Sequence, residues 1–310
     1  MMRSAIGWLL EFAMMALIAI LLASVLVPSL EYSVALSNFW PHLGLALAAC
    51  GAFRAGCVKQ LWSAARILLG LAFVAYAFFS VRPVNHQEIV QANAPLKIVT
   101  FNLRNDNRRN ADRLMDFLIS LDADFVFLQE AGAIEGSFDR LLAHYPHKSG
   151  CEPGTDCSML LLSHHPFEAV ERPDGPPGSH RFAIVRSRVN DVAINVVGLH
   201  LTKPLMRGRQ TREIDHAAAR ISKLRDPVIV AGDFNAAPWS LSMRRFLAGT
   251  GLRLPYGYRP TWPTWLPFVG LPLDHVLVRG SLSVGRIDVL SETIGSNHRP
   301  VIAYIDLPGN

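Results

Sequence analysis

Six short segments carry side chains that can hold a metal ion, move a proton or grip a phosphate. Their candidate residues are Asn102, Glu130, His200, Asp233 with Asn235, Asp274, and Asn297 with His298. A hard divalent ion takes oxygen ligands such as carboxylates, and Mg²⁺ completes its shell with water and phosphate. A water nucleophile needs a base, which histidine supplies when a carboxylate orients its ring. These residue types therefore suit metal-assisted hydrolysis of a phosphate ester.

The elements that must position these residues follow from hydrophobic periodicity. The pattern predicts strands at residues 96–101, 124–128, 158–163, 182–189, 193–199, 227–231, 275–278 and 301–305, and helices at 111–121, 210–224 and 240–247. Many strands, few helices and an opening β–α–β order predict an α/β fold, a layered sandwich of two mixed sheets flanked by helices. Polar residues just past buried strands point into a common crevice, where α/β proteins bind their ligands.

Charge divides the chain of 310 residues into two parts. Residues 1–84 hold only 7 of the 55 charged side chains. This distribution excludes a disordered chain, a collagen-like repeat and a single uniform soluble domain. It predicts a transmembrane module at 1–82, a linker at 83–95 and a globular domain at 96–310. That domain has 25 Lys and Arg against 22 Asp and Glu, and a net charge of +3 fits an anionic substrate without requiring nucleic acid.

The module is predicted to contain about three membrane helices, near residues 12–30, 35–53 and 61–81. The first has 19 uncharged residues, enough to cross about 30 Å of hydrocarbon. The second is weakened by Asn38, Pro41 and His42. The third spans only if Arg66 extends its charge toward the interface. A cleaved secretory signal is the alternative for the first segment, but further apolar segments follow it.

Lys and Arg set the predicted orientation. Arg3 precedes the first helix, and Arg54, Lys59 and Arg66 lie between or at the start of the later helices, whereas residues 31–37 have no positive charge. The positive-inside rule then places the N-terminus in the cytoplasm. Three crossings put the globular domain outside, and loss of one crossing would reverse this.

The cysteines bear on the compartment. Cys50 and Cys57 are seven residues apart on a predicted helix, about 10 Å along its axis, so they cannot pair. Cys151 and Cys157 bracket a turn-rich stretch that can bring them together. A disulfide there suits an oxidising compartment, and two free thiols in a loop are the alternative.

The polar segments also form an ordered series. Asn102, Gln129-Glu130, His200, Gly232-Asp233-Phe234-Asn235, Asp274 and Ser296-Asn297-His298 together resemble the endonuclease/exonuclease/phosphatase superfamily. Each motif alone is weak, whereas six in this order at strand ends are specific. The resemblance covers essentially the whole globular domain. The N-terminal apolar region is similar to a membrane-anchored bacterial branch. Together with the predicted helices and their orientation, this resemblance implies a multi-pass protein of the bacterial plasma (inner) membrane with an extracytoplasmic catalytic domain.

The resemblance implies a metal and phosphate shell. Glu130 would ligate Mg²⁺, or alternatively Mn²⁺, with Asn102 beside it in the metal and phosphate shell. Asp233 and Asn235 would contact the scissile phosphate, and Asp233 would also orient the attacking water.

The resemblance also implies an acid–base and phosphate-binding set. His298 would act as the general base or as a phosphate-stabilising imidazolium, with Asp274 fixing its ring. His200 would donate a hydrogen bond to a phosphate oxygen. Arg181 is similar, more loosely, to a phosphate-gripping arginine.

Asn297 departs from the family pattern, which usually has Asp immediately before the final His. The exchange removes one negative charge near the metal and keeps a neutral oxygen beside the phosphate. We expect weaker metal affinity, or an ion held nearer to Glu130. An inactive relative that only binds phosphorylated ligands is the alternative.

Two further features remain open in the sequence. The Pro-rich segment 261–272 contains Trp262, Trp265 and Phe268, and it is expected to be a folded core loop, a bilayer contact or a stacking surface for bases. The remaining histidines are expected to be ordinary surface or core residues: His144, His147, His164, His165, His180, His216 and His275.

The sequence thus predicts a membrane-anchored, Mg²⁺-dependent phosphoester hydrolase, a nuclease-like phosphodiesterase in which water is activated at His298 and Asp233. The alternatives are a lipid phosphodiesterase or phosphatase acting at the bilayer, and a non-catalytic phospho-ligand sensor. The predicted partners are a phosphoester substrate, nucleic acid or phospholipid, and the lipid bilayer. No obligate protein partner is inferred.

Overall fold

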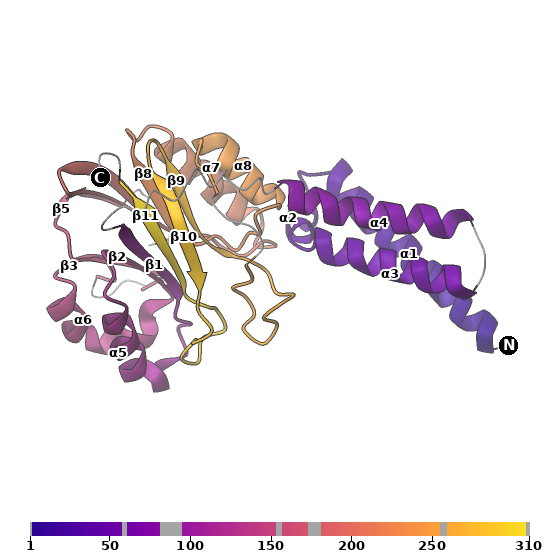
Figure 1. Cartoon of the computed structure of the whole chain (residues 1–310), viewed down its shortest axis with the longest axis horizontal. Helices are drawn as coiled ribbons and strands as arrows, with labels where there is room; N and C mark the ends of the chain where they lie inside the picture. Colours follow the sequence, from indigo (N-terminus) through magenta and orange to yellow (C-terminus); the bar gives the residue numbers. More distant parts are fainter. Residues whose placement is uncertain are drawn as a thin grey trace.

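The computed structural model describes residues 2–57, 61–80, 95–152, 157–172, 181–254 and 259–307. Of the predicted linker at 83–95, all but Pro95 lies outside these residues. A helical module extends from one side of a layered α/β domain (Figure 1). Its helices are α1 (Met2–Leu26), α2 (Glu31–Ser37), α3 (Trp40–Cys57) and α4 (Leu61–Ser80).

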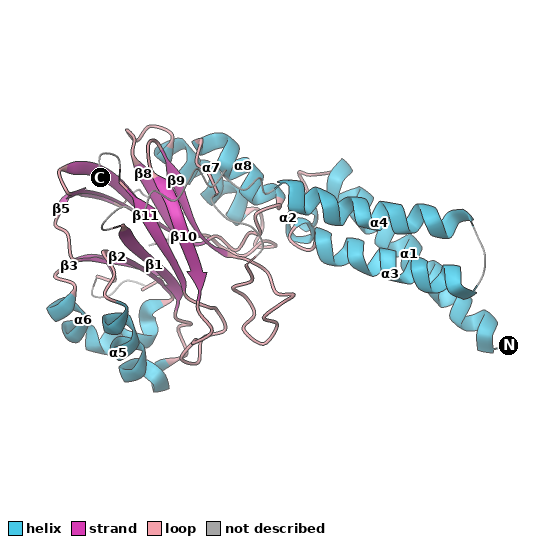
Figure 2. Cartoon of the chain, in the orientation of Figure 1, coloured by secondary structure: helices cyan, strands magenta, loops and turns pink. Residues whose placement is uncertain are grey.

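The domain contains two mixed sheets (Figure 2). The first has the order β10-β11-β1-β2-β4-β3, formed by β1 (Leu96–Asn102), β2 (Phe125–Gln129), β3 (His147–Gly150), β4 (Met159–Ser163), β10 (Ser283–Val289) and β11 (Val301–Asp306). The second has the order β5-β6-β7-β8-β9, formed by β5 (Phe167–Glu171), β6 (Phe182–Val189), β7 (Val192–His200), β8 (Val228–Asp233) and β9 (Asp274–Arg279). The predicted fold class is confirmed.

Central strands are apolar on both faces because both faces are covered. In β2, Phe125 and Phe127 pack in the cluster between the two sheets, whereas Val126 and Leu128 pack under the outer helices. Side chains alternate along a strand, so this apolar run fills two cores. The outer helices over the first sheet are α5 (Ala111–Leu121) and α6 (Phe138–His144), and those over the second are α7 (Arg209–Ile221) and α8 (Leu241–Thr250).

The helical module packs closely inside and exposes apolar side chains outside. A Cβ on Gly44 would lie 2.6 Å from the Gly70 carbonyl oxygen, so α3 and α4 touch backbone to backbone there. Among the described residues, two helices are long and apolar enough to cross a membrane, over Gly7–Leu26 and Trp62–Phe79; α3, in the region of the second predicted membrane helix, is not one of them. Large apolar side chains are exposed on the module, among them Trp8, Phe12, Leu26, Leu45, Phe53, Trp62, Leu68 and Phe79.

The module differs from its sequence prediction at two places. α1 ends at Leu26 rather than near residue 30, because Pro28 has no N–H to continue the helix. The stretch predicted as one helix at 35–53 divides between α2 and α3. At this division the buried Asn38 accepts hydrogen bonds from the domain, at its Oδ1 from the Ala237 N–H (2.6 Å) and at its carbonyl from Trp239 Nε1 (3.0 Å).

The N-terminus and the connection from α3 to α4 lie at the end of the module away from the domain (Figure 1). Glu11 lies between the helices near that end and pairs with Arg54 (3.0 Å) and Arg66 (2.7 Å). The charge of Arg66, expected from the sequence to extend toward the membrane interface, is therefore paired within the module.

Candidate active site

The predicted site residues lie where strands of both sheets end. β1 and β2 are parallel, as are β7 and β8. Their register aligns Asn102 with Gln129 in the first sheet, and His200 with Asp233 in the second. Asp233 is in turn aligned with Asp274 at the start of the antiparallel β9. The topology therefore brings residues more than 100 positions apart to the same end of the two sheets.

Asn102 connects the two sheets at this end of their strands. Its side-chain nitrogen donates to Asp233 Oδ2 at 3.0 Å and to Glu130 Oε1 at 3.3 Å. The Asn102 carbonyl accepts from the Ser296 hydroxyl at 2.6 Å, and the Ser296 oxygen accepts from the His298 N–H at 3.0 Å. The buried residue Asn102 thus links Glu130 and Asp233 through its side chain and the last motif through its main-chain carbonyl.

The segment after β8 fixes Asp233 by local geometry. Gly232 has φ of +153°, and a Cβ there would lie 1.7 Å from the Leu199 carbonyl oxygen, so only glycine fits. Asp233 Oδ1 accepts from the Asn235 N–H at 2.8 Å, and Asn235 Nδ2 donates to the Leu201 carbonyl at 2.9 Å. The Asp233 carboxylate is therefore held by Asn235, which is itself anchored to the Leu201 carbonyl.

His298 and Asp274 form a buried pair. His298 Nδ1 lies 2.9 Å from Asp274 Oδ2, and its Nε2 lies 3.9 Å from Asp233 Oδ2. Burial by itself lowers the pKa of His298, but the carboxylates of Asp274 and Asp233 outweigh it and raise the pKa to about 9. The imidazole is therefore charged at neutral pH, with Nε2 turned toward Asp233.

The pKa of Asp233 is also raised, to a value nearer neutral pH. Burial and the nearby negative charge of Asp274 raise the pKa of Asp233 to about 6, against the opposing effect of His298. This carboxyl group can therefore accept and release a proton close to neutral pH.

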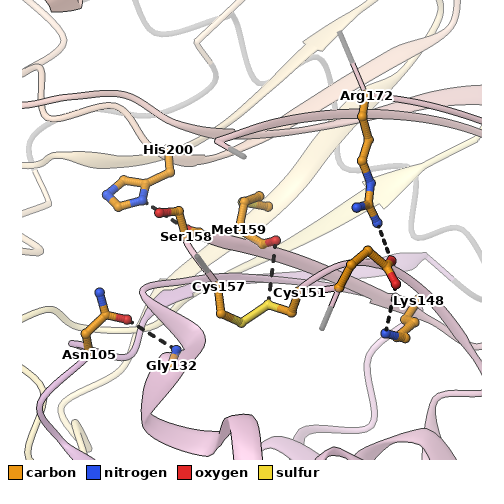
Figure 3. The surroundings of a disulfide bond; sticks show 10 residues. Asn105, Gly132, Lys148, Cys151, Cys157, Ser158, Met159, Arg172 and His200 are labelled. Carbon is orange, nitrogen blue, oxygen red and sulfur yellow. Dashed lines mark hydrogen bonds and ion pairs between the residues drawn. A yellow bond between two sulfur atoms is a disulfide. The ribbon is translucent and has the colours of Figure 1, made fainter. Parts of the chain in front are cut away.

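His200 faces the same carboxylate from β7. Its Nε2 lies 3.9 Å from Asp233 Oδ2, and its Nδ1 lies 3.0 Å from the Ser158 carbonyl (Figure 3). A carbonyl oxygen only accepts, so Nδ1 carries the proton. Burial and the charge of Arg181 hold the pKa of His200 well below its ordinary value, so Nε2 is an acceptor in this state. Arg181 donates to the His200 carbonyl at 3.1 Å.

The disulfide between Cys151 and Cys157 supports this part of the site (Figure 3). Of the two alternatives left open by the sequence, the bridge is therefore present. The Ser158 carbonyl, next to Cys157, accepts from both His200 and the Glu130 N–H, the latter at 3.2 Å. The bridged loop thus positions two site residues through one carbonyl.

Glu130 lies at the open side of the cluster. It is half-buried and has φ of +51° directly after β2. Oε2 accepts from the Asn105 N–H at 3.2 Å. Gln129 points instead into the core, where its amide contacts Thr100 at 3.1 Å. Half of the Gln129-Glu130 motif is therefore structural.

The segment 261–272 forms the wall of the site next to the last motif. The Thr261 hydroxyl oxygen accepts from the N–H groups of Leu273 (3.0 Å) and Asp274 (3.2 Å). The Asn297 carbonyl accepts from the Thr264 N–H at 3.1 Å. Asn297 is partly exposed beside the buried His298.

Sequence reasoning missed three supporting residues: Thr261, Ser296 and Asn105. Ser296 belongs to a recognised motif, but its bond to β1 has no local signal. Asn105 and Thr261 act through backbone groups distant in sequence, so only the tertiary structure identifies them. The structure brings together Asn102, Asp233, Asn235, Asp274, His298, His200 and Glu130 and leaves Arg181 and Asn297 beside them.

The donor set fits a divalent cation. Ligand atoms of Asp233, Asp274 and His298 lie within 4.8 Å of one another, and Asn102 joins Glu130 to the same group. Three carboxylates face one imidazolium, and burial together with the charge of Asp274 raises the pKa of Asp233. A cation beside Glu130 and Asn102 would favour the charged form of these carboxylates.

Solved structures share the fold at low sequence identity. Sphingomyelinase C from Streptomyces griseocarneus has a TM-score of 0.51 and 20% identity over 68% of this chain and 99% of its own. An endonuclease/exonuclease/phosphatase protein from Beutenbergia cavernae has 0.54 and 19%, covering 70% and 72%. Humanized TDP2 from D. rerio has 0.55 and 18%, covering 68% and 99%. No curated protein sequence matches the chain significantly.

A family model matches residues 99–298, which begin within β1 and end at His298. This range contains every residue of the cluster and both sheets' central strands. By this match over most of its length, the chain belongs to the Endonuclease/Exonuclease/phosphatase family.

Proposed function

We propose that the chain is a membrane-anchored, divalent-metal-dependent phosphodiester hydrolase. The observation that carries the proposal is the continuous polar chain from Glu130 through Asn102 to Asp233, with the His298–Asp274 pair facing it. Family membership supports metal-dependent phosphoester hydrolysis in general.

Glu130 and Asn102 would hold Mg²⁺, with Mn²⁺ as a substitute. When bound, such an ion polarises a phosphoryl oxygen and neutralises developing negative charge. Glu130 suits this role because its carboxylate is half-buried rather than enclosed.

The buried residues would divide the proton and phosphate work. Asp233, with its pKa of about 6, accepts the proton of an attacking water, while Asn235 keeps its carboxylate oriented. His298, charged at neutral pH, stabilises the negative charge that develops on the phosphate oxygens, and Asp274 keeps its ring in place. Of the two sequence-based roles for His298, the geometry favours the imidazolium.

His200 and Arg181 would complete phosphate binding. His200 donates through Nε2 only after gaining a proton, which the arrival of an anionic phosphate favours. Arg181 adds positive charge behind it. Asn297 is a neutral neighbour of the phosphate.

The helical module supports membrane anchoring with the domain outside the cytoplasm. Its exterior is apolar, its helices touch at Gly44 and Gly70, and its N-terminus lies opposite the domain. Close glycine contacts are typical of helices packed in lipid. A reporter fused at Asn310 that works only outside the cytoplasm should be active, and equal activity of an intracellular reporter would overturn the orientation.

The position of the module favours phospholipid over nucleic acid as the substrate. Asn38 binds the loop just after Asn235, and His42 Nε2 donates to the Val269 carbonyl at 2.6 Å. The module therefore joins the domain at two loops of the site. Trp265 and Phe268, 75% and 86% exposed, lie on the second loop, where they could enter a bilayer that surrounds the module.

The purified full chain should be assayed on DNA, RNA, a soluble model diester and phospholipid vesicles, each with Mg²⁺, Mn²⁺ or EDTA. We expect metal-dependent turnover and a preference for vesicles. A strong preference for free oligonucleotides would remove the lipid proposal, and tight binding without turnover would favour a sensor.

Variants of the second loop separate membrane contact from chemistry. Trp265→Ala and Phe268→Ala should each lower vesicle hydrolysis by at least about tenfold, since burying a large apolar side chain in the bilayer contributes about 1.5–3 kcal/mol. Hydrolysis of the soluble diester should fall far less. Val170→Ala, a control at a half-exposed apolar residue of β5, should change neither; equal losses on both substrates would contradict bilayer contact.

A further inference from the structure

A second group, of two imidazoles and one carboxylate, lies where strands of the first sheet end on the side opposite the candidate active site. Nε2 of His144 and Nε2 of His164 lie 3.0 and 3.1 Å from the same oxygen, Oδ1 of Asp122. Asp122 follows α5, His144 ends α6 and His164 follows β4. Three segments distant in sequence therefore converge on one point.

This group is separate from the active site. β2 runs from Phe125 to Gln129, next to Glu130, and the antiparallel β4 ends at Ser163, next to His164. The five residues of β2 separate the two groups by about 17 Å. An ion held at one group would therefore not share ligands with the other.

We propose that Asp122, His144 and His164 form a site for a borderline transition-metal ion of the Zn²⁺ class. Their three ligand atoms lie within 4.8 Å of one another. Bonds of about 2.0–2.1 Å to a tetrahedral ion would set neighbouring ligand atoms about 3.3 Å apart. The observed distances of 3.0 and 3.1 Å between nitrogen and oxygen need only a small outward movement.

The surrounding contacts hold the two rings in place before any ion binds. The Tyr145 ring packs on both imidazoles, with centroids 4.7 Å from each. Its hydroxyl donates to the Leu118 carbonyl at 2.9 Å and accepts from the Ala123 N–H at 3.2 Å. Tyr145 is therefore itself fixed, which lowers the entropy lost when the imidazoles become ligands.

The ligand types and exposure define what would bind. Two imidazoles with one carboxylate favour Zn²⁺, Ni²⁺ or Cu²⁺ over Mg²⁺, which prefers oxygen. The His144 and His164 side chains are 30% and 32% exposed and that of Asp122 is 70% exposed. Water can therefore supply the fourth ligand, and the ion has an open path from solvent.

Binding would join the end of α5, the end of α6 and the end of β4 through one ion. Since an ion that binds only the folded state stabilises it by mass action, Zn²⁺ should raise the Tm of the full chain. Mg²⁺ at the same concentration should not act through these residues.

The test is Zn²⁺ titration of the full chain in excess Mg²⁺, monitored by competition with a chromophoric chelator and by Tm. A parallel series in the His298→Ala background removes the imidazole of the active-site group, the ligand there that Zn²⁺ would prefer. We expect one Zn²⁺ per chain in both, and a loss of affinity of more than about 100-fold in His144→Ala and in His164→Ala. His147→Ala, a neighbouring histidine outside the group, should retain full affinity.

Asp122→Asn is a second variant that preserves the turn. Residue 122 has φ of +44°, which Asn tolerates well, so the chain should fold while losing the charged ligand. It should bind Zn²⁺ more weakly than the unaltered chain. Equal Zn²⁺ affinity and an equal Tm increase in all of these variants, checked for folding in EDTA, would overturn the proposal.

Discussion

The described part of the chain contains two groups of aspartate and histidine side chains, one buried and one partly exposed to solvent. Asp233, Asp274 and His298 are buried at the edge that meets the helical module, whereas Asp122, His144 and His164 lie partly in solvent at the opposite edge. Burial raises the pKa of Asp233 to about 6, and the neighbouring carboxylates raise that of His298 to about 9. The buried group can therefore exchange protons and stabilise charge, while the exposed one offers ligands only.

The two groups also differ in the structural elements that hold their side chains in place. The exposed group rests on one sheet, whereas the buried group joins two sheets through Asn102 and touches the module through the loop bound by Asn38. A reacting group needs tight positioning by several elements. The following predictions, in order of expected effect, test whether burial and attachment make the difference.

The largest effect should come from the buried group itself. His298→Ala or Asp233→Ala should lower kcat by about 10²–10⁴-fold, the scale of losing a charge-stabilising group or a proton acceptor. Steady-state rates on a soluble phosphodiester give the measurement. His147→Ala, at the opposite end of the sheet, is the control and should keep the full rate. A comparable loss of rate in this variant would show that the effect is not specific to the buried group.

Attachment to the module should matter next. Asn38→Ala leaves the buried Ala237 N–H without its acceptor, which should cost about 1–3 kcal/mol. The loop after Asn235 should then be less well placed, with kcat lower by up to about 100-fold. Ser33→Ala removes a hydrogen bond inside the module, to the Ala23 carbonyl, and serves as control. Thermal melts and rates that are unaffected in Asn38→Ala would show that the module is only an anchor.

Burial should also give stability a specific pH dependence. Because the pKa of His298 is raised from 6.5 to about 9 on folding, its contribution is fully present below about pH 6.5 and is lost as pH rises through about 9. In EDTA, the Tm difference between the unaltered chain and His298→Gln should therefore shrink between pH 6.5 and 9. A constant difference across this window would argue against a charged His298.

The smallest effect should follow Asn297→Asp, at the partly exposed position beside the buried group. The added carboxylate should tighten Mg²⁺ binding by about tenfold and leave turnover equal or higher. Calorimetric titration with Mg²⁺ and kcat provide the readouts. If activity is abolished instead, Asn297 is adapted to an anionic substrate that a further carboxylate repels.

Interior strands could be predicted from the sequence, whereas three of the four edge strands in the described residues could not. The fourth, β9, is buried along most of its length and was predicted at 275–278. Every strand predicted from an apolar run is present, but β3, β5 and β10 were not predicted, and all three are at sheet edges. An edge strand has less buried surface, and β5 is exposed at Glu168 through Glu171. Its side chains therefore lack the pattern that burial imposes. The short α6, with only Leu141 buried, was missed for the same reason.

The candidate site was largely predictable because its residues directly follow buried strands. What remained hidden are contacts made by chain segments that meet only in the folded state. Ser296 binds the backbone of β1 from 194 residues away, and His144 and His164, expected to be ordinary histidines, converge because α6 and β4 end at the same edge. No local pattern encodes such meetings.

The most direct measurement is the rate of phosphodiester hydrolysis by the purified full chain as the divalent ion is removed and restored. If the buried group acts together with a divalent ion, turnover should stop in EDTA and return with added Mg²⁺. In His298→Ala, turnover should stay about 10²–10⁴-fold lower after Mg²⁺ is restored. Turnover that persists in EDTA, or a folded chain that hydrolyses no phosphodiester with Mg²⁺ or Mn²⁺, would contradict a metal-dependent hydrolase.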